Sequence, residues 1–230
     1  MDWERKQEMR KLLHADYDEC SRCNLCEPTG RRRHNVVLGQ GNLDAQVVIV
    51  GGSPGYNEDL AGTPFVGKAG DLMEDFFSAV GVSREEVYLL NVVGCWPTET
   101  AIPKKKRNPT RGEIKACVDL AYRTIEIIDP YVLLLLGSVA LKTMTRDTRT
   151  INKIAKDDRI PVLTSYTRGL QVDVPRAAFA TLHPTALLQQ KWDPSDGGAI
   201  DLALRTWHRA FQVADKHSQL YKGTTPRFGT

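Results

Sequence analysis

Residues 47–70 read VVIVGGSPGYNEDLAGTPFVGKAG, an apolar run followed by a segment with six glycines and two prolines. The β-branched run predicts a buried strand of the kind found in parallel sheets. Glycine has no Cβ, so the backbone after this strand can approach a ligand closely or turn through positive φ. With a helix predicted from about Lys68 to Val80, the order strand, loop and helix favours a binding or catalytic site at the carboxyl edge of a sheet. The alternative is that the glycines only turn the chain.

Strands and helices alternate along the rest of the sequence. The first strand is expected near residues 46–50, and apolar runs predict three more at 87–93, 132–136 and 178–182. Apolar spacing and the capping pair Thr110 and Glu113 predict further helices at residues 3–15, 110–128 and 198–214. We therefore expect a three-layer α/β/α sandwich around a central, mostly parallel four-stranded sheet.

The composition is that of an ordinary globular chain of 230 residues, 41% hydrophobic and 26% charged. We expect a single domain over residues 1–230, with a cysteine loop at about 16–42 and a loose tail at about 218–230. No apolar run approaches the roughly 20 residues needed to cross a bilayer, and the charged first ten residues do not resemble a secretory signal. The chain is thus expected to be an intracellular monomer without membrane association.

The net charge of +3 says little, but basic residues gather in two blocks. One is residues 31–34 (RRRH), and the other is Lys104, Lys105, Lys106 and Arg107. Both lie in segments expected to be loops. Blocks of this kind bind phosphate backbones through counterion release. The alternative is a solvated basic surface.

The five cysteines suggest a metal site. Three of them form a C-x2-C-x2-C run at Cys20, Cys23 and Cys26, and Cys95 and Cys117 follow far downstream. In a reducing compartment such thiols are more often ligands or reduced cysteines than disulfides. Thiolates bind both zinc and iron–sulfur clusters, so the ligand type alone does not choose the metal. Cys95 and Cys117 could also be small core residues.

Several separated motifs resemble one known family. Residues 51–70 are similar to the G-E-A-P-G-x-x-E-D…G-x-P-F-V-G-x-A-G signature of the iron–sulfur uracil-DNA glycosylases, often called family four. Residues 91–97 (NVVGCWP) resemble its N-V-V-K-C-R-P block, and 108–117 resemble its N-R-x-P-x-x-x-E-I-x-x-C block. His183-Pro184-Thr185 stands where that family has H-P-A or H-P-S. The likeness extends in the same order from about Cys20 to Leu188.

This resemblance implies a [4Fe–4S] cluster. Its ligands would be Cys20, Cys23, Cys95 and Cys117, with Cys26 as the spare cysteine. The cluster of this family is regarded as structural, and electron transfer is the functional alternative.

The resemblance also implies hydrolysis of the N-glycosidic bond of uracil, or of a related base, in DNA, which leaves an abasic site. Such a reaction needs a flipped base in a pocket and donors at the negative charge that develops on it. By analogy Phe65 would stack on the base, Asn91 would recognise its edge, and His183 would donate to its carbonyl oxygen. Alternatively these would be a core phenylalanine, a loop cap and a structural histidine.

The remaining site residues follow from the same analogy. Glu58 would orient groups around the sugar, unless it is only a solvated loop residue. The loop backbone would contact the substrate at Gly51, Gly52, Ser53, Pro54 and Gly55. The DNA backbone or duplex would be contacted by Lys104, Lys105, Lys106, Arg107, Thr185 and Leu187. Leu187 and Leu188 are candidates for a wedge into the duplex, although they could instead begin a helix and face the core.

The sequence departs from the family pattern at the predicted pocket. Gly52 and Ser53 replace Glu and Ala, and Gly94 and Trp96 replace Lys and Arg. Without a carboxylate at position 52 the chemistry could be weakened, redirected or lost. A second hypothesis is therefore a protein that binds DNA or a modified base without cutting it. A third, an iron–sulfur redox protein, would leave Phe65, Asn91 and His183 unexplained.

Overall fold

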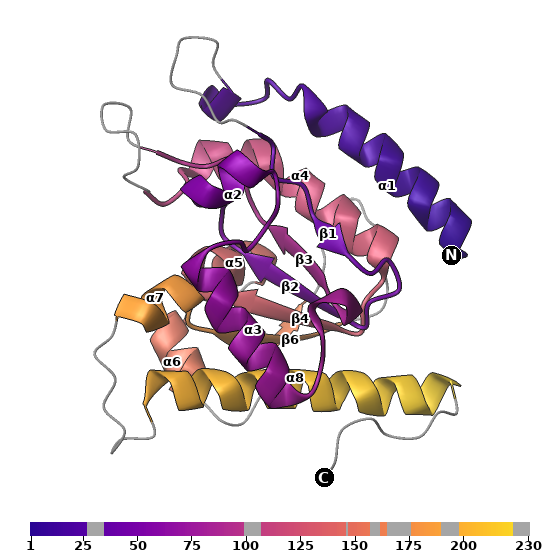
Figure 1. Cartoon of the computed structure of the whole chain (residues 1–230), viewed down its shortest axis with the longest axis vertical. Coiled ribbons are helices and arrows are strands. Elements are labelled where there is room, and N and C mark those ends of the chain that lie inside the picture. Colours follow the sequence, from indigo (N-terminus) through magenta and orange to yellow (C-terminus); the bar gives the residue numbers. More distant parts are fainter. Residues whose placement is uncertain are drawn as a thin grey trace.

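The computed structural model describes residues 1–26, 35–98, 107–145, 147–156, 162–164, 176–189 and 198–222 (Figure 1). The basic residues 31–34 and 104–106 and the tail from residue 223 lie outside this range. No helix among the described residues is long and apolar enough to cross a membrane.

A six-stranded sheet, in the order β1-β3-β2-β4-β6-β5, forms the centre of the described structure. Its four parallel strands are β2 (Val47–Gly51), β3 (Tyr88–Asn91), β4 (Val132–Leu136) and β6 (Arg176–Thr181), and they confirm the four predicted ones. Two antiparallel strands, β1 (Gln40–Gly41) and β5 (Val162–Thr164), extend the edges. They were not predicted, because two or three residues are too few to show an alternating pattern.

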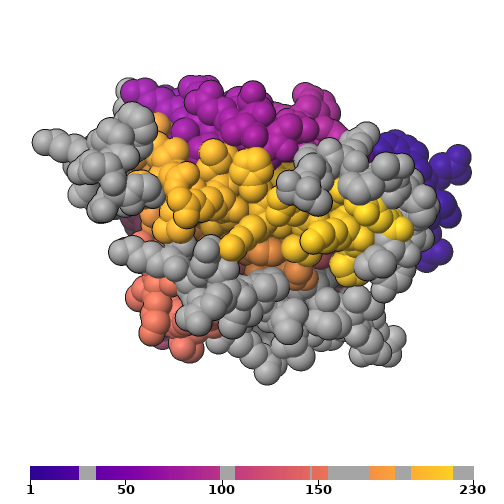
Figure 2. Space-filling model, turned by 90° about the horizontal axis from the view of Figure 1, so that it is seen from below, coloured from indigo at the N-terminus to yellow at the C-terminus, as the bar shows by residue number. Residues whose placement is uncertain are grey.

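Helices cover both faces of the sheet, as the predicted sandwich requires. Alternate strand residues divide into two cores, with Val48 and Val50 facing α1 and α4, and Val47 and Ile49 facing α3 and α8. Figure 2 shows α8 running across the second face beside α3. The helices are α1 (Trp3–Asp18), η1 (Asn24–Cys26), α2 (Tyr56–Ala61), α3 (Lys68–Val80), η2 (Arg84–Glu86), α4 (Arg111–Ile128), α5 (Gly137–Met144), α6 (Ile151–Lys156), α7 (Pro184–Gln189) and α8 (Ala199–Lys222).

Helices α3 and α4 follow the predictions closely. Thr110 accepts the backbone N–H of Glu113, and the Glu113 carboxylate accepts the N–H of Thr110, so the predicted capping box begins α4. The helix α2 was not predicted, because it is a short helix inside the glycine-rich segment. Helix α8 extends eight residues beyond the predicted end at residue 214.

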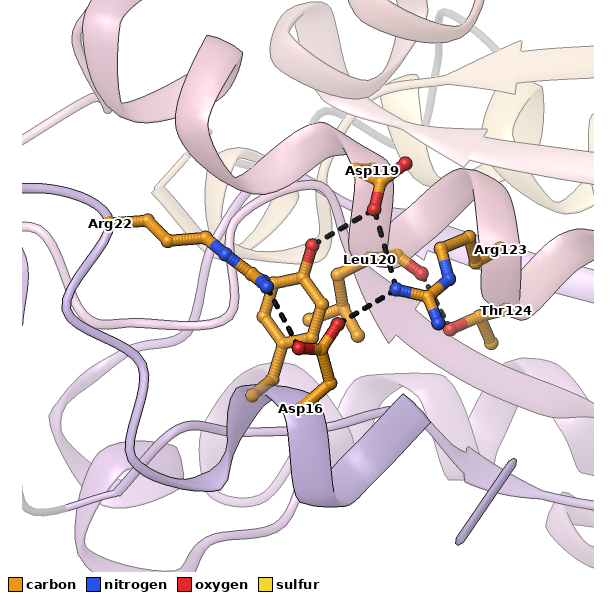
Figure 3. Close-up of polar contacts among 7 residues, drawn as sticks. Asp16, Arg22, Asp119, Leu120, Arg123 and Thr124 are labelled. Atoms are coloured by element: carbon orange, nitrogen blue, oxygen red, sulfur yellow. Dashed lines mark hydrogen bonds and ion pairs between the residues drawn. The ribbon is translucent and has the colours of Figure 1, made fainter. Parts of the chain in front are cut away.

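Polar contacts join α1 to α4 and to Arg22 in the segment after α1 (Figure 3). The Asp16 carboxylate accepts from Arg123 at 2.8 Å and from Arg22 at 3.0 Å. Arg22 lies between Cys20 and Cys23 in the sequence, and its guanidinium stands 4.0 Å from the centre of the Tyr17 ring. Exposed ion pairs of this kind add little stability each, so their main effect is to place the cysteine segment against α4.

Lys6 makes the deepest polar contact of α1. Its Nζ atom donates to the backbone carbonyl oxygens of Leu43 at 3.0 Å and Ile128 at 2.9 Å. It also pairs with the Asp44 carboxylate at 2.8 Å, and only 8% of the Lys6 side chain is exposed. The ammonium thus joins α1, the end of α4 and the turn before β2.

We expect Lys6→Met to lower the free energy of unfolding by about 2–4 kcal/mol, because it leaves two buried carbonyl groups without a donor. Urea denaturation of the purified variant measures this change. Lys11→Met is the matched control on the exposed side of α1, and it should stay within about 0.5 kcal/mol of the unmodified chain. Equal stability of the two variants would contradict a structural role for the Lys6 ammonium.

Candidate active site

The predicted site residues gather where the four parallel strands end. Gly51 and Asn91 end β2 and β3 and stand opposite each other in the sheet register. Gly137 directly follows β4, and His183 lies two residues after the end of β6. Because the carboxyl ends of parallel strands share one edge, residues far apart in the sequence meet here.

Asn91 holds a buried carboxamide that the described protein leaves unbonded. The residue is 4% exposed, and neither Oδ1 nor Nδ2 has a hydrogen-bond partner among the described residues. A Cβ placed on Gly51 would lie 2.3 Å from Asn91 Oδ1 and 2.7 Å from Cζ of Phe65. Only glycine therefore fits between the carboxamide and the aromatic ring. An unbonded buried amide costs about 1–3 kcal/mol, which a ligand with a matching donor and acceptor would recover.

Phe65 adopts an unusual backbone conformation beside Asn91. Its φ is 54°, in the left-handed region that costs a residue with a Cβ about 1–2 kcal/mol. The Glu58 carboxylate accepts the backbone N–H of Phe65 at 2.8 Å, and it also accepts the N–H of Gly55. The Phe65 and His183 rings are stacked, with their centroids 6.3 Å apart. Glu58 thus holds the loop that carries Phe65.

His183 precedes α7 and is oriented by that helix. Its Nδ1 atom accepts the backbone N–H of Thr185 at 3.2 Å. In the neutral imidazole the proton is then assigned to Nε2, which makes Nε2 a donor. Gly137 has a φ of +86°, and a Cβ there would lie 3.1 Å from the Cβ of His183. A glycine at position 137 therefore allows this close approach.

A pocket of about 510 Å³ opens beside these residues. Its polar lining includes Ser53, Arg107, Asn108 and His183. Asn91 and Phe65 are not among its lining residues, but His183, which does line the pocket, stacks on Phe65. The full lining is Gly52, Ser53, Arg107, Asn108, Pro109, Leu136, Gly137, Ser138, Val139, His183, Thr185, Ala186 and Gln189.

Similarity to known proteins decides the family. The sequence pattern described as "Uracil DNA glycosylase superfamily" matches residues 38–203, which is most of the chain. The chain belongs to this superfamily. It is 35% identical over 183 residues to the type-4 uracil-DNA glycosylase of Thermotoga maritima, covering 79% of this chain and 85% of that protein. It is 34% identical over 179 residues to the type-4 uracil-DNA glycosylase of Pyrobaculum aerophilum, covering 77% and 84% of the two chains.

Gly52 is tightly enclosed in this superfamily member. A Cβ at position 52 would lie 3.0 Å from the Cβ of Val139, so a side chain there would have to displace Val139. No acidic side chain is among the lining residues of the pocket in the described structure. Position 52 therefore carries no carboxylate, and the apolar side chain of Val139 occupies the space beside it.

Arg107 is the one residue of the second basic block that the structure describes. It lines the pocket and holds the Glu113 carboxylate through two bonds, at 2.8 and 2.6 Å. Arg107 lowers the pKa of Glu113 below its usual value, and the backbone N–H of Thr110 adds to this effect. The pair fixes the guanidinium at the pocket wall and joins it to the first turn of α4.

The leucines after His183 require one correction. Leu187, a predicted DNA contact, is 2% exposed and packs in the core beneath α7, because its position on the helix faces the sheet. Leu188 is the exposed leucine, with 49% of its surface accessible. Thr185 is also exposed.

The four predicted ligand cysteines are reduced in the described structure and pack in or against one core. Cys95 and Cys117 are buried, and Cys117 Sγ accepts the backbone N–H of Gly94 at 3.2 Å. Burial raises the pKa of Cys117 to about 11, and the neighbouring thiols of Cys20 and Cys23 act in the same direction. No group of three or more His, Cys, Asp or Glu side chains that could hold a metal ion occurs among the described residues.

Sequence reasoning missed part of the pocket wall. Gly137 and Ser138 directly follow the apolar run of β4, which is the same signal that singled out Gly51 after β2. That signal could have found them. Val139 lies on α5, and no sequence pattern marks it as a pocket residue, because its contact with Gly52 depends on how that helix packs.

Proposed function

We propose that this chain hydrolyses the N-glycosidic bond of uracil in DNA, releasing the base and leaving an abasic site. The observation that carries the proposal is the buried, unbonded carboxamide of Asn91 at the carboxyl end of β3. A carboxamide can donate to one atom and accept from its neighbour, which matches the O4 and N3–H edge of uracil. The buried polar group then has a reason to be there.

Phe65 and His183 act on the base in different ways. Phe65, which is 2% exposed and packs in the same core as α3 in the free protein, would stack on the face of the flipped base. His183 donates from Nε2 to the uracil carbonyl oxygen, where negative charge grows as the bond between C1′ and N1 breaks. The electron pair of that bond stays with the uracil ring. Water forms a bond to C1′ of the sugar cation and releases a proton to the solvent, and the uracil anion takes up a proton.

The water is placed without a carboxylate from position 52. Ser53 is buried and lines the pocket, so its hydroxyl is positioned to orient the water. The backbone N–H groups between Gly51 and Ser53 add donors near the base. Gly52 and Val139 supply no base at this point, and we expect the rate to depend mainly on stabilisation of the departing uracil.

Basic residues at Arg107 and directly before it in the sequence would contact the DNA. Arg107 stands at the pocket wall, and Lys104, Lys105 and Lys106 directly precede it. These residues and Thr185 are suited to contact phosphate groups on either side of the flipped nucleotide. Leu188, in place of Leu187, is the exposed leucine that fits a wedge into the duplex.

Cys20, Cys23, Cys95 and Cys117 would hold a [4Fe–4S] cluster. The donor type fits, because iron–sulfur clusters are held by four cysteine thiolates, and the four cysteines come from three segments that pack in or against one core, with Cys20 and Cys23 near enough to act on Cys117. The described side chains are not gathered as a metal site, so binding would draw the four thiols together. When bound, the cluster supplies cross-links between these segments. Gly94 donates to Cys117 and lies three residues after Asn91, so one short segment joins the cysteines to the end of β3 at the site.

A base-release assay tests the proposed reaction. An oligonucleotide with one uracil is incubated with the protein, and abasic sites are cleaved with alkali and counted. We expect release with the unmodified chain, and a loss of about 100- to 1,000-fold in His183→Ala. His208→Ala, on the exposed side of α8, is the matched control and should keep full activity. Tight binding of the oligonucleotide without any base release would overturn the proposed hydrolase activity.

A further inference from the structure

The backbone of Phe65 is held from several directions at once. Its N–H donates to Glu58, as described above. Its carbonyl oxygen accepts from the Arg84 guanidinium at 3.1 Å. On the same side, a Cβ on Gly70 would lie only 2.1 Å from this oxygen, so α3 packs directly against it.

Arg84 comes from a separate part of the chain. It begins η2, which is stabilised by a capping box between Ser83 and Glu86. Its Nη2 atom donates to the carbonyl oxygens of both Pro64 and Phe65, at 2.6 and 3.1 Å. Its Nη1 atom pairs with Glu74 on α3 at 2.9 Å. The side chain is 25% exposed, and both terminal nitrogens of the guanidinium are engaged with the protein.

We propose that Arg84 is a positioning residue for base recognition, acting through Phe65. The inference rests on the proposed function, in which Phe65 stacks on the base. A left-handed φ at a phenylalanine persists only where its surroundings hold it. Glu58 fixes the N–H and Arg84 fixes the carbonyl oxygen, so the two opposite charges clamp the peptide groups on both sides of one Cα. That clamp sets the direction of the Cα–Cβ bond and so the plane of the ring.

The geometry favours this role over contact with DNA. Arg84 directs its Nη2 to two carbonyl oxygens and its Nη1 to a carboxylate, and unlike Arg107, which is also paired, it does not line the pocket. A misplacement of about 1 Å at a reacting group can cost about 100-fold in rate. Loss of the clamp should therefore impair catalysis without unfolding the protein.

A double-mutant cycle tests the proposal. Single-turnover rates of uracil release are compared for the unmodified chain, Arg84→Ala, Phe65→Ala and the double variant. We expect Arg84→Ala to be slower by about 10- to 100-fold, and the double variant to be no slower than Phe65→Ala alone. If the rate losses of the two single variants multiply in the double variant, the proposal is overturned, because Arg84 then acts independently of Phe65.

Two further measurements separate positioning from other roles. Glu74→Gln removes the ion pair but keeps the bonds to Pro64 and Phe65, so its rate should stay within about two-fold. Arg84→Ala should leave the salt dependence of oligonucleotide binding unchanged, whereas a lost phosphate contact would reduce its slope by about one. A reduced slope would contradict the proposal.

Hydrogen exchange tests the clamp even if the proposed reaction fails. The backbone amides of residues 63–67 are followed by mass spectrometry in the absence of DNA. We expect faster exchange in Arg84→Ala than in the unmodified chain and in Glu74→Gln. Unchanged exchange would overturn the clamp, while absence of uracil release from the unmodified chain would overturn the proposed function alone.

Discussion

Asn91→Ala is expected to reduce uracil release by about 100- to 1,000-fold without making the protein less stable. The carboxamide lies at the carboxyl end of β3 opposite Gly51, and the described protein gives it no hydrogen-bond partner. Its removal therefore deprives the base of its matching edge but breaks no bond within the protein.

The expected stability distinguishes best between a role of Asn91 in recognition and a role in the fold. A buried polar group with a structural role loses its partners on substitution, and the protein loses about 1–3 kcal/mol. Asn91→Leu, which keeps the number and branching of the side-chain heavy atoms, should instead keep or raise the free energy of unfolding, because an unsatisfied amide is replaced by an apolar side chain. Urea denaturation and the base-release assay are carried out on both variants.

Asn57→Ala is the matched control, since Asn57 is an exposed asparagine on α2. It should change neither the rate nor the stability substantially. A marked destabilisation by Asn91→Leu would show that the carboxamide supports the fold. Unimpaired release in Asn91→Ala would remove it from the recognition site.

The strands of the sandwich could be predicted because their signals are local. An apolar run such as Val132–Leu136 needs no information from elsewhere, and the structure has this strand at the predicted residues. The capping residues Thr110 and Glu113 likewise mark the start of α4. The strands β1 and β5 depend instead on pairing with β3 and β6, which short segments do not reveal.

The site was predictable only in part, for a related reason. Its residue types follow from the loops after the strands, but their contacts depend on packing between distant segments. Glu58 could not be placed from the sequence, and the structure shows its carboxylate bound to the N–H groups of Gly55 and Phe65. The contact of Val139 with Gly52 and the reach of Arg84 to Phe65 have no sequence signal.

Loss of the proposed cluster is expected to have a second large effect, on metal content and on stability. We expect Cys117→Ser to remove the iron and sulfide from the purified protein, together with the visible absorption of the cluster. The free energy of unfolding should fall by several kcal/mol, on the order of 5, because the binding energy of a structural metal group contributes directly to folding. Without it, α4 and the cysteine segment are joined by their shared apolar core and by exposed ion pairs around Asp16.

Serine is a suitable replacement at this position. Burial raises the pKa of the Cys117 thiol to about 11, so without a metal the thiol is neutral at pH 7. A serine hydroxyl is also neutral and nearly the same size, and its oxygen can accept the N–H of Gly94 as the sulfur does. The substitution thus removes a ligand without burying a charge or opening a cavity, and the loss of stability can be attributed to the metal group.

Cys26→Ser is the matched control, because Cys26 is the cysteine that the proposed ligand set leaves out. Iron and sulfide content, absorption and urea denaturation should match those of the unmodified chain. Loss of the cluster in Cys26→Ser would mean that the ligand set is wrong. Zinc as the only metal in the unmodified protein would exclude the cluster but leave the four thiols as a metal site. In that case the base-release chemistry of Asn91, Phe65 and His183 would be unaffected, since none of its steps passes through the cysteines.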